Sequence, residues 1–99
     1  MHTILRTAVF DTWLSKLKDP LGKARIIERI RSAERGNFGD CESVGNGVWE
    51  MRIHFGPGYR VYFSRTGDVV YVLLCAGTKS GQRRDIARAQ AMARQLKED

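Results

Sequence analysis

Apolar residues in the first third of the chain recur with the spacing of helices. After a short apolar start at residues 4–9, one set follows the spacing i, i+3, i+4 and i+7, which predicts a short helix: Phe10, Trp13, Leu14 and Leu17. Asp19 as the N-cap and Pro20 as the first helical residue predict a second helix, which ends at Gly36. Its predicted buried stripe is Leu21, Ala24, Ile27, Ile30 and Ala33.

Across residues 48–64 the apolar positions alternate with polar ones, as they do on strands. Two alternating segments flank Gly56-Pro57-Gly58, which predicts a tight hairpin. One face of this hairpin is apolar and is expected in the core: Trp49, Met51, Ile53, Phe55, Tyr59, Val61 and Phe63. The other face is polar and mainly cationic, which suits a phosphate-bearing ligand: Glu50, Arg52, His54, Arg60, Tyr62 and Ser64.

Further elements are predicted on both sides of the hairpin. A weak strand at residues 41–44 precedes an Asn46-Gly47 turn, and residues 69–76 are apolar on both faces, as in the middle of a sheet. Ser80 caps a predicted last helix, whose apolar stripe is Ile86, Ala89, Ala93 and Leu96. The expected fold class is α+β: a small antiparallel sheet of three to five strands with two N-terminal helices and a C-terminal helix. We expect the helices on one face of the sheet and the arginine face open.

Length and composition narrow the possible functions. The 99 residues predict one domain over residues 1–99, and the net charge of +6 favours nucleic acid or an acidic protein as a partner, with a basic protein that has neither as the alternative. No stretch approaches the roughly 20 apolar residues of a membrane span, so we expect a cytoplasmic protein with no membrane contact. Cys41 and Cys75 lack CxxC spacing and are predicted to be reduced. His2 and His54 lie far apart without an acidic cluster, so no metal or cofactor is expected.

The polar face of the hairpin carries groups that cleavage of an RNA phosphodiester needs. Attack by the neighbouring 2′-hydroxyl requires a base, cations around the phosphate and an acid for the departing oxygen, but no metal. Arg52 and Arg60 are candidates for the cations, and His54 is the candidate for proton transfer, because histidines exchange protons near neutral pH. Lys79 follows the central strand and is placed to reach the same phosphate. Gln82 or Ser80 is a candidate to orient a base or a 2′-hydroxyl.

Simpler interpretations stand beside these. His54 fits a solvated strand histidine equally well, and Arg52 and Arg60 fit ion pairs with Glu50. The arginines early in the last predicted helix fit either a solvated helix face or a surface that steers RNA toward the sheet: Arg83, Arg84 and Arg88. No serine has a nearby histidine with an acidic partner, and neither glycine-rich segment has the spacing of a phosphate loop.

A set of spaced motifs, covering residues 8–90, resembles the phage-derived addiction-module killer proteins, a HigB-like branch of the RelE/ParE toxin superfamily. The motifs are Phe10 with Trp13-Leu14, Arg25-Ile26 with Arg29-Ile30, Gly36-Asn37-Phe38-Gly39-Asp40, Val44-Gly45-Asn46-Gly47-Val48, Glu50-Met51-Arg52, Gly56-Pro57-Gly58-Tyr59-Arg60-Val61-Tyr62, and Lys79 with Gln82 and Asp85-Ile86.

The resemblance implies the toxin of a type II toxin–antitoxin pair. Its partner would be a cognate antitoxin, usually a helix-turn-helix, HigA-like protein. The toxin would contact operator DNA only through this antitoxin. Members of the RelE and HigB branches cleave mRNA on the ribosome, whereas ParE members poison DNA gyrase without being nucleases. A non-catalytic module that only binds the antitoxin is a further alternative.

The resemblance also implies roles for single residues. Arg60 matches the sheet arginine of the RelE-like ribonucleases, Arg52 lies where those enzymes place basic residues, and Lys79 matches a basic position after the last strand. RelE has a functional tyrosine near its C-terminus, but no tyrosine follows Tyr71 here, so that role is empty or is taken by a group such as His54 or Gln82. The predicted catalytic residues are Arg52, His54, Arg60 and Lys79. The predicted RNA-binding residues are Tyr62, Gln82, Arg83, Arg84 and Arg88.

Overall fold

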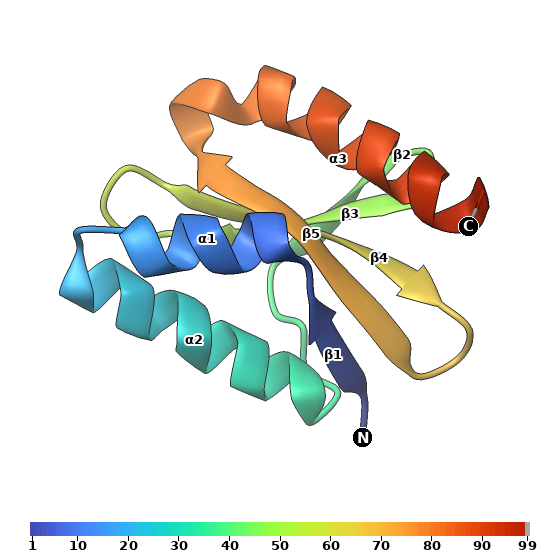
Figure 1. The fold of residues 1–99 in the computed structure, drawn as a ribbon. Coiled ribbons are helices and arrows are strands. Elements are labelled where there is room, and N and C mark those ends of the chain that lie inside the picture. The colour runs from blue at the N-terminus through green and yellow to red at the C-terminus, as the bar shows by residue number, and fades with distance from the viewer. Residues whose placement is uncertain (99) are drawn as a thin grey trace.

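The computed structural model describes residues 1–98 and shows a five-stranded sheet with helices on both faces (Figure 1). The elements in chain order are β1 (Thr3–Arg6), α1 (Ala8–Lys16), α2 (Pro20–Glu34), β2 (Cys41–Gly45), β3 (Val48–Ile53), β4 (Tyr59–Thr66), β5 (Val70–Thr78), the 3-10 turn η1 (Lys79–Gly81) and α3 (Gln82–Glu98). The α+β fold, with two helices before the main sheet and one after it, is confirmed. The strand order is β1-β5-β4-β3-β2, and only β1 pairs in parallel, with β5.

Helices α1 and α2 cover one face of the sheet and enclose the larger core. Phe10 and Leu14 of α1 pack there with Ile26 of α2 and with Met51 and Val61 of the hairpin. The hairpin residues predicted for the core therefore lie largely where the alternation placed them.

The predicted stripe of α2 is wrong at its start. Leu21 is 69% exposed and Ala24 is exposed as well, whereas the buried residues of this helix are Gly22, Ile26, Ile30 and Ala33. The first turn packs so closely on the hairpin that a Cβ on Gly22 would lie 2.6 Å from the Tyr59 ring. Because Gly22 faces the core, the neighbouring Leu21 side chain is turned toward solvent.

Helix α3 packs on the opposite face, so the expectation that all helices share one face and leave the other open is wrong. Ala89 and Ala93 of α3 bury Val48, Tyr62 and Leu74 in a second core. The reason lies in β5, which is apolar on both faces and needs cover on both. Gly77, near the end of β5, lies directly against α3. A Cβ on this glycine would overlap the Asp85 carboxylate of the helix.

Trp49 is a second exception to the predicted core. Its side chain is 42% exposed and lines a cavity of about 240 Å³ with Phe38 and Phe63. Trp49 lies on the predicted face of β3, but it sits beyond the part of that face that α1 and α2 cover. Alternation alone cannot show where a helix ends over a sheet.

A half-buried hydrogen bond links the hairpin to the connection between the two N-terminal helices. The Tyr59 hydroxyl donates to Asp19 Oδ2 at 2.5 Å, and Asp19 Oδ1 accepts from the backbone N–H of Gly22 at 3.0 Å, which caps α2 as predicted. Two causes raise the pKa of Tyr59 to about 12: burial of the ring is the larger, and the hydrogen bond to Asp19 is the smaller. In residues 1–98, no helix has both the length and the apolar composition needed to cross a membrane.

Replacing Tyr59→Phe should lower the free energy of unfolding by about 1.5–3 kcal/mol, because the bond joins a hydroxyl to a charged carboxylate. The wild type should also lose stability as the pH rises from 10, the ordinary tyrosine value, toward about 12, since unfolded tyrosine releases its proton first. Urea unfolding at pH 7 and across that range measures both effects. Tyr71→Phe is the control, because the Tyr71 hydroxyl makes no hydrogen bond within residues 1–98; equal losses for the two variants would contradict this assignment.

Candidate functional site

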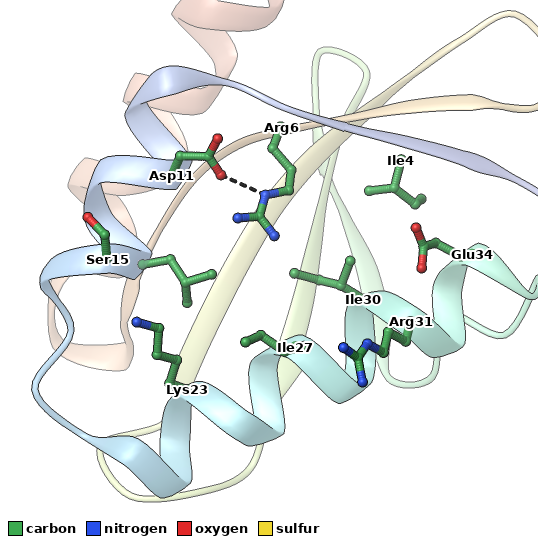
Figure 2. Close-up of a pocket in the computed structure, with 10 residues that line it drawn as sticks. Ile4, Arg6, Asp11, Ser15, Lys23, Ile27, Ile30, Arg31 and Glu34 are labelled. Atoms are coloured by element: carbon green, nitrogen blue, oxygen red, sulfur yellow. Dashed lines mark hydrogen bonds and ion pairs between the residues drawn. The ribbon is translucent and has the colours of Figure 1, made fainter.

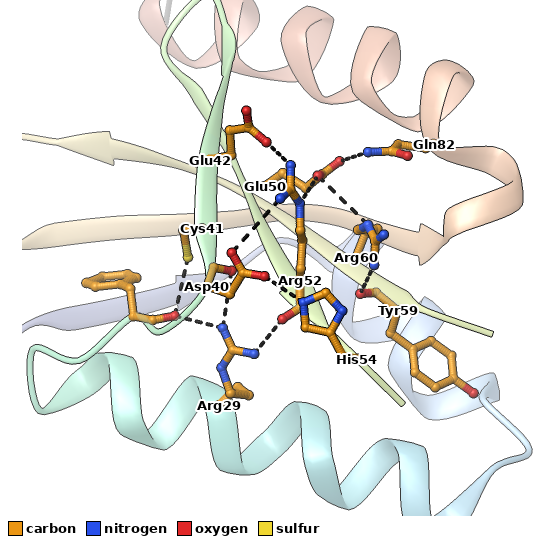
Figure 3. Close-up of polar contacts among 11 residues, drawn as sticks. Arg29, Asp40, Cys41, Glu42, Glu50, Arg52, His54, Tyr59, Arg60 and Gln82 are labelled. Carbon is orange, nitrogen blue, oxygen red and sulfur yellow. Dashed lines mark hydrogen bonds and ion pairs between the residues drawn. The ribbon is translucent and has the colours of Figure 1, made fainter. Parts of the chain in front are cut away.

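The hairpin brings the predicted polar residues of β3 and β4 into direct register. Arg52 lies opposite Arg60, and Glu50 lies opposite Tyr62. Glu50, Arg52 and Arg60 (Figure 3) share the face that α3 partly covers with Tyr62, which packs under that helix. The start of α3 reaches the same place through Gln82.

Glu50 lies at the centre of this group and is fully buried, at 0% exposure. Its Oε1 accepts a hydrogen bond from Arg52 Nε at 3.0 Å and lies 3.8 Å from Arg60 Nε. Its Oε2 accepts from Gln82 Nε2 at 2.7 Å. One carboxylate therefore joins β3, β4 and α3, and the ion pairs of Arg52 and Arg60 with Glu50, which the sequence left open, are present.

Arg52 has two further acidic neighbours at the surface. Its guanidinium forms an ion pair with Glu42 of β2, and its Nη1 lies 4.0 Å from Asp40 Oδ1. The prediction of a simply cationic face is therefore wrong, because carboxylates from residues 40–50 balance much of its charge. The strand at residues 41–44 and its turn into β3 were predicted, but the sequence alone did not show which side chains of the two strands meet, so the pairing of Arg52 with Glu42 was missed.

His54 lies just past the end of β3 and has an acidic partner. Its side chain is 68% exposed, and its Nε2 lies 2.6 Å from Asp40 Oδ2. The hydrogen bond from His54 lowers the pKa of Asp40 below its ordinary range. Because an ionised carboxylate only accepts hydrogen bonds, Nε2 carries the proton of this contact, and Nδ1 is the basic nitrogen of the neutral ring.

Arg29 holds the segment that carries Asp40 against the hairpin. From α2, it donates to the carbonyl oxygens of Arg52 at 2.5 Å, Phe38 at 2.9 Å and Asp40 at 3.4 Å. The contact of Arg29 with three carbonyls depends on tertiary structure, which helical spacing does not show.

Arg60 and Lys79 meet across Gly58. Arg60 is only 7% exposed, and its Nη1 donates to the Tyr59 carbonyl at 3.2 Å. A Cβ on Gly58 would lie 3.3 Å from Lys79 Cβ and 3.5 Å from Arg60 Nη1. Lys79 is exposed in η1, and its side chain begins close to the buried arginine.

The predicted RNA-binding residues are divided among different surroundings. Tyr62 is fully buried under α3, its hydroxyl has no hydrogen-bond partner, and burial raises its pKa, so it offers no surface for stacking on a base. Gln82 is half-buried on Glu50. The three predicted arginines of α3, at positions 83, 84 and 88, are exposed, but Arg84 and Arg88 line a separate cavity of about 370 Å³ beside Trp13. The structure thus brings five predicted residues together: Arg52, Arg60, Lys79, Gln82 and His54, the last of these through Asp40. It leaves Arg84 and Arg88 apart.

Another cavity, of about 430 Å³, lies between β1, α1 and α2 and contains none of the predicted site residues (Figure 2). Arg6 Nε donates to Asp11 Oδ1 at 2.6 Å on its wall. Its lining is mixed in charge and apolar at the base, with Ile27 and Ile30. Within residues 1–98, no three histidine, cysteine, aspartate or glutamate side chains are grouped as metal ligands would be.

Replacing Arg29→Ala should lower the free energy of unfolding by about 1.5–3 kcal/mol, since a cation that donates to three backbone carbonyls is lost. Arg31→Ala, on the exposed face of the same helix, is the matched control and should change stability by less than about 0.5 kcal/mol. Chemical denaturation measures both variants. A cost for Arg29→Ala no larger than that of the control would show that the three carbonyl contacts do not stabilise the fold.

The contact between His54 and Asp40 should appear in acid titration. Because the pKa of Asp40 is lowered in the folded state, the contact stabilises the protein above the ordinary value of 3.8, and this stabilisation is lost as the pH falls through the folded pKa. Carbon NMR of the Asp40 carboxyl should give a midpoint below 3.8 in the wild type and a higher midpoint in His54→Ala. Identical midpoints would contradict the contact.

Comparison with known proteins agrees with this fold. The family model of phage-derived Gp49-like proteins (DUF891) matches residues 12–97. A protein of Haemophilus influenzae (strain ATCC 51907 / DSM 11121 / KW20 / Rd), described as uncharacterized, is 48% identical over 93 residues, which cover 94% of each chain. The chain belongs to the phage-derived Gp49-like family, part of the RelE/ParE-like toxin superfamily.

Proposed function

We propose that this chain is the toxin of a type II toxin–antitoxin pair, of the HigB-like branch, and that it cleaves mRNA on the ribosome. One observation carries the proposal: two arginines opposite each other, Arg52 and Arg60, stand with Lys79 and with a histidine–aspartate pair at the turn end of one hairpin. These groups are what 2′-hydroxyl attack on a phosphodiester requires.

In the proposed reaction, the 2′-hydroxyl oxygen bonds to phosphorus while the bond from phosphorus to the 5′ oxygen breaks. Nδ1 of His54 takes the proton of the 2′-hydroxyl, and Asp40 stabilises the imidazolium through Nε2. Arg52 and Arg60 stabilise the charge that builds on the phosphate oxygens. Lys79, beside Arg60, supplies the proton to the departing 5′ oxygen. The products are a 2′,3′-cyclic phosphate and a 5′-hydroxyl.

The acidic neighbours of Arg52 are compatible with binding a phosphate. Glu42 and Asp40 have side chains that are 59% and 47% exposed. Exposed ion pairs of this kind contribute only about 0–1 kcal/mol. A phosphate, which accepts two parallel hydrogen bonds from a guanidinium, can therefore replace them at little cost.

The proposal includes a cognate antitoxin as the protein partner, expected to be a helix-turn-helix, HigA-like protein that alone contacts operator DNA. The net charge of +6 suits an acidic segment of that partner. The mRNA and the ribosome are the other partners, which places the activity in the cytoplasm. No cofactor is needed for the proposed reaction.

The direct test is production of the chain without an antitoxin. Wild-type protein should stop translation and leave mRNA cut within coding sequence. His54→Ala and Arg60→Ala should slow cutting in a purified translation reaction by about 10²- to 10⁴-fold, the usual cost of losing a proton-transfer or charge-stabilising group. Arg94→Ala, an exposed arginine near the end of α3, should cut as fast as the wild type.

Other outcomes identify the alternatives. Intact mRNA together with inhibited DNA supercoiling would indicate a ParE-like gyrase inhibitor. Antitoxin binding with neither effect would indicate a non-catalytic module. Full toxicity of Arg60→Ala would show that the proposed site is wrong.

A further inference from the structure

We propose that Glu50 is a positioning residue of the proposed ribonuclease site. Its buried carboxylate orients Arg52 and Gln82 by hydrogen bonds and draws Arg60 in by charge, so that side chains from three elements face one phosphate. This inference rests on the proposed function and assigns a role to a residue that does not itself touch the substrate.

The burial of Glu50 makes its contacts obligatory. At 0% exposure, its carboxylate cannot be hydrated, so its charge must be balanced by cations and hydrogen-bond donors of the protein. Asp40 and Glu42 are half-exposed and can give up Arg52 to a phosphate, because water takes their place. Glu50 has no such exchange available. Its partners therefore keep their orientation when substrate arrives.

Arg60 shows the consequence of this arrangement. Its Nε is buried without a hydrogen-bond partner and lies 3.8 Å from Glu50 Oε1, which is too long for a hydrogen bond but short for a charge contact. A guanidinium has five N–H donors, and within residues 1–98 only the Tyr59 carbonyl accepts from this one. Glu50 thus holds the charge of Arg60 in place, while Nη2, which makes no hydrogen bond within residues 1–98, is left for a phosphate.

Gln82 is oriented by the same carboxylate. Because an ionised carboxylate only accepts hydrogen bonds, the amide nitrogen of Gln82 must face Glu50 Oε2, at 2.7 Å. The amide oxygen then remains as the acceptor on the other side of the group. An acceptor there suits the 2′-hydroxyl of an RNA, which must be aligned before it can attack.

A glutamine at position 50 cannot reproduce these contacts. Its amide has one oxygen to accept from Arg52 and Gln82, and its NH₂ group would face a donor. Glu50→Gln also raises the net charge from +6 to +7, which strengthens attraction to RNA. We therefore expect slower cleavage together with equal or tighter RNA binding, a combination that a merely structural role would not produce.

The experiment measures RNA affinity by equilibrium binding and the single-turnover rate of mRNA cleavage on the ribosome. Glu50→Gln should cleave at least tenfold more slowly than the wild type, with an RNA dissociation constant that is unchanged or lower. Glu28→Gln removes the same charge from the exposed face of α2 and should leave the cleavage rate unchanged. Glu50→Asp keeps the charge with a shorter side chain, so it preserves the charge balance of the fold, and it too should cleave more slowly at unchanged affinity.

Two results would overturn the role of Glu50 while leaving the proposed function intact. One is wild-type cleavage by Glu50→Asp, or by folded Glu50→Gln. The other is a parallel loss of RNA binding and cleavage in step with the folded fraction, which indicates a structural role only. If the wild type itself cuts no mRNA on the ribosome, the proposed function fails, and the role of Glu50 falls with it.

Discussion

A carboxylate buried inside the sheet is the constraint on which the rest of the site depends. Glu50 is removed from water, so the fold must supply it with donors, and it does so from β3, β4 and the start of α3 at once. The same contacts keep α3 on the face that β5 needs covered. The position of Gln82 and the placement of the two arginines are therefore consequences of one electrostatic requirement, whereas the second core follows from the apolar residues of β5 on that face.

Burial divides the charges of the site into two groups with different behaviour. Glu50 and Arg60 lie below 10% exposure and form a fixed frame, whereas Asp40, Glu42, His54 and Lys79 are exposed and able to exchange partners. A protein with a net charge of +6 thus presents a site whose arginines are already balanced by carboxylates. In the proposed reaction, an RNA phosphate would compete for Arg52 against weak surface ion pairs and not against the buried one, so a charge-compensated site could still take an anion.

Local patterns predicted much of this fold because they report on single elements. The spacing after Phe10, the cap at Asp19 and the alternation around Gly56-Pro57-Gly58 identified α1, α2 and the hairpin. They failed where an outcome depends on how elements pack: Leu21 faces solvent because Gly22 is pressed on Tyr59, Trp49 lies beyond the covering helices, and α3 takes the other face. In the site, Arg52, His54 and Arg60 were found from their shared face. Their partner Asp40 and the clamp formed by Arg29 were not, because those contacts cross 14 and 23 residues of sequence.

In the proposed reaction, this charge arrangement directs the 2′-hydroxyl of mRNA onto its neighbouring phosphate. The chemical form of the RNA ends tests it most directly. Fragments from a purified translation reaction with the wild-type protein should carry a 5′-hydroxyl on one side of each cut and a 2′,3′-cyclic phosphate, or the phosphate formed by its opening, on the other. A 5′-phosphate with a free 3′-hydroxyl would require water or another nucleophile to attack, and would contradict the account.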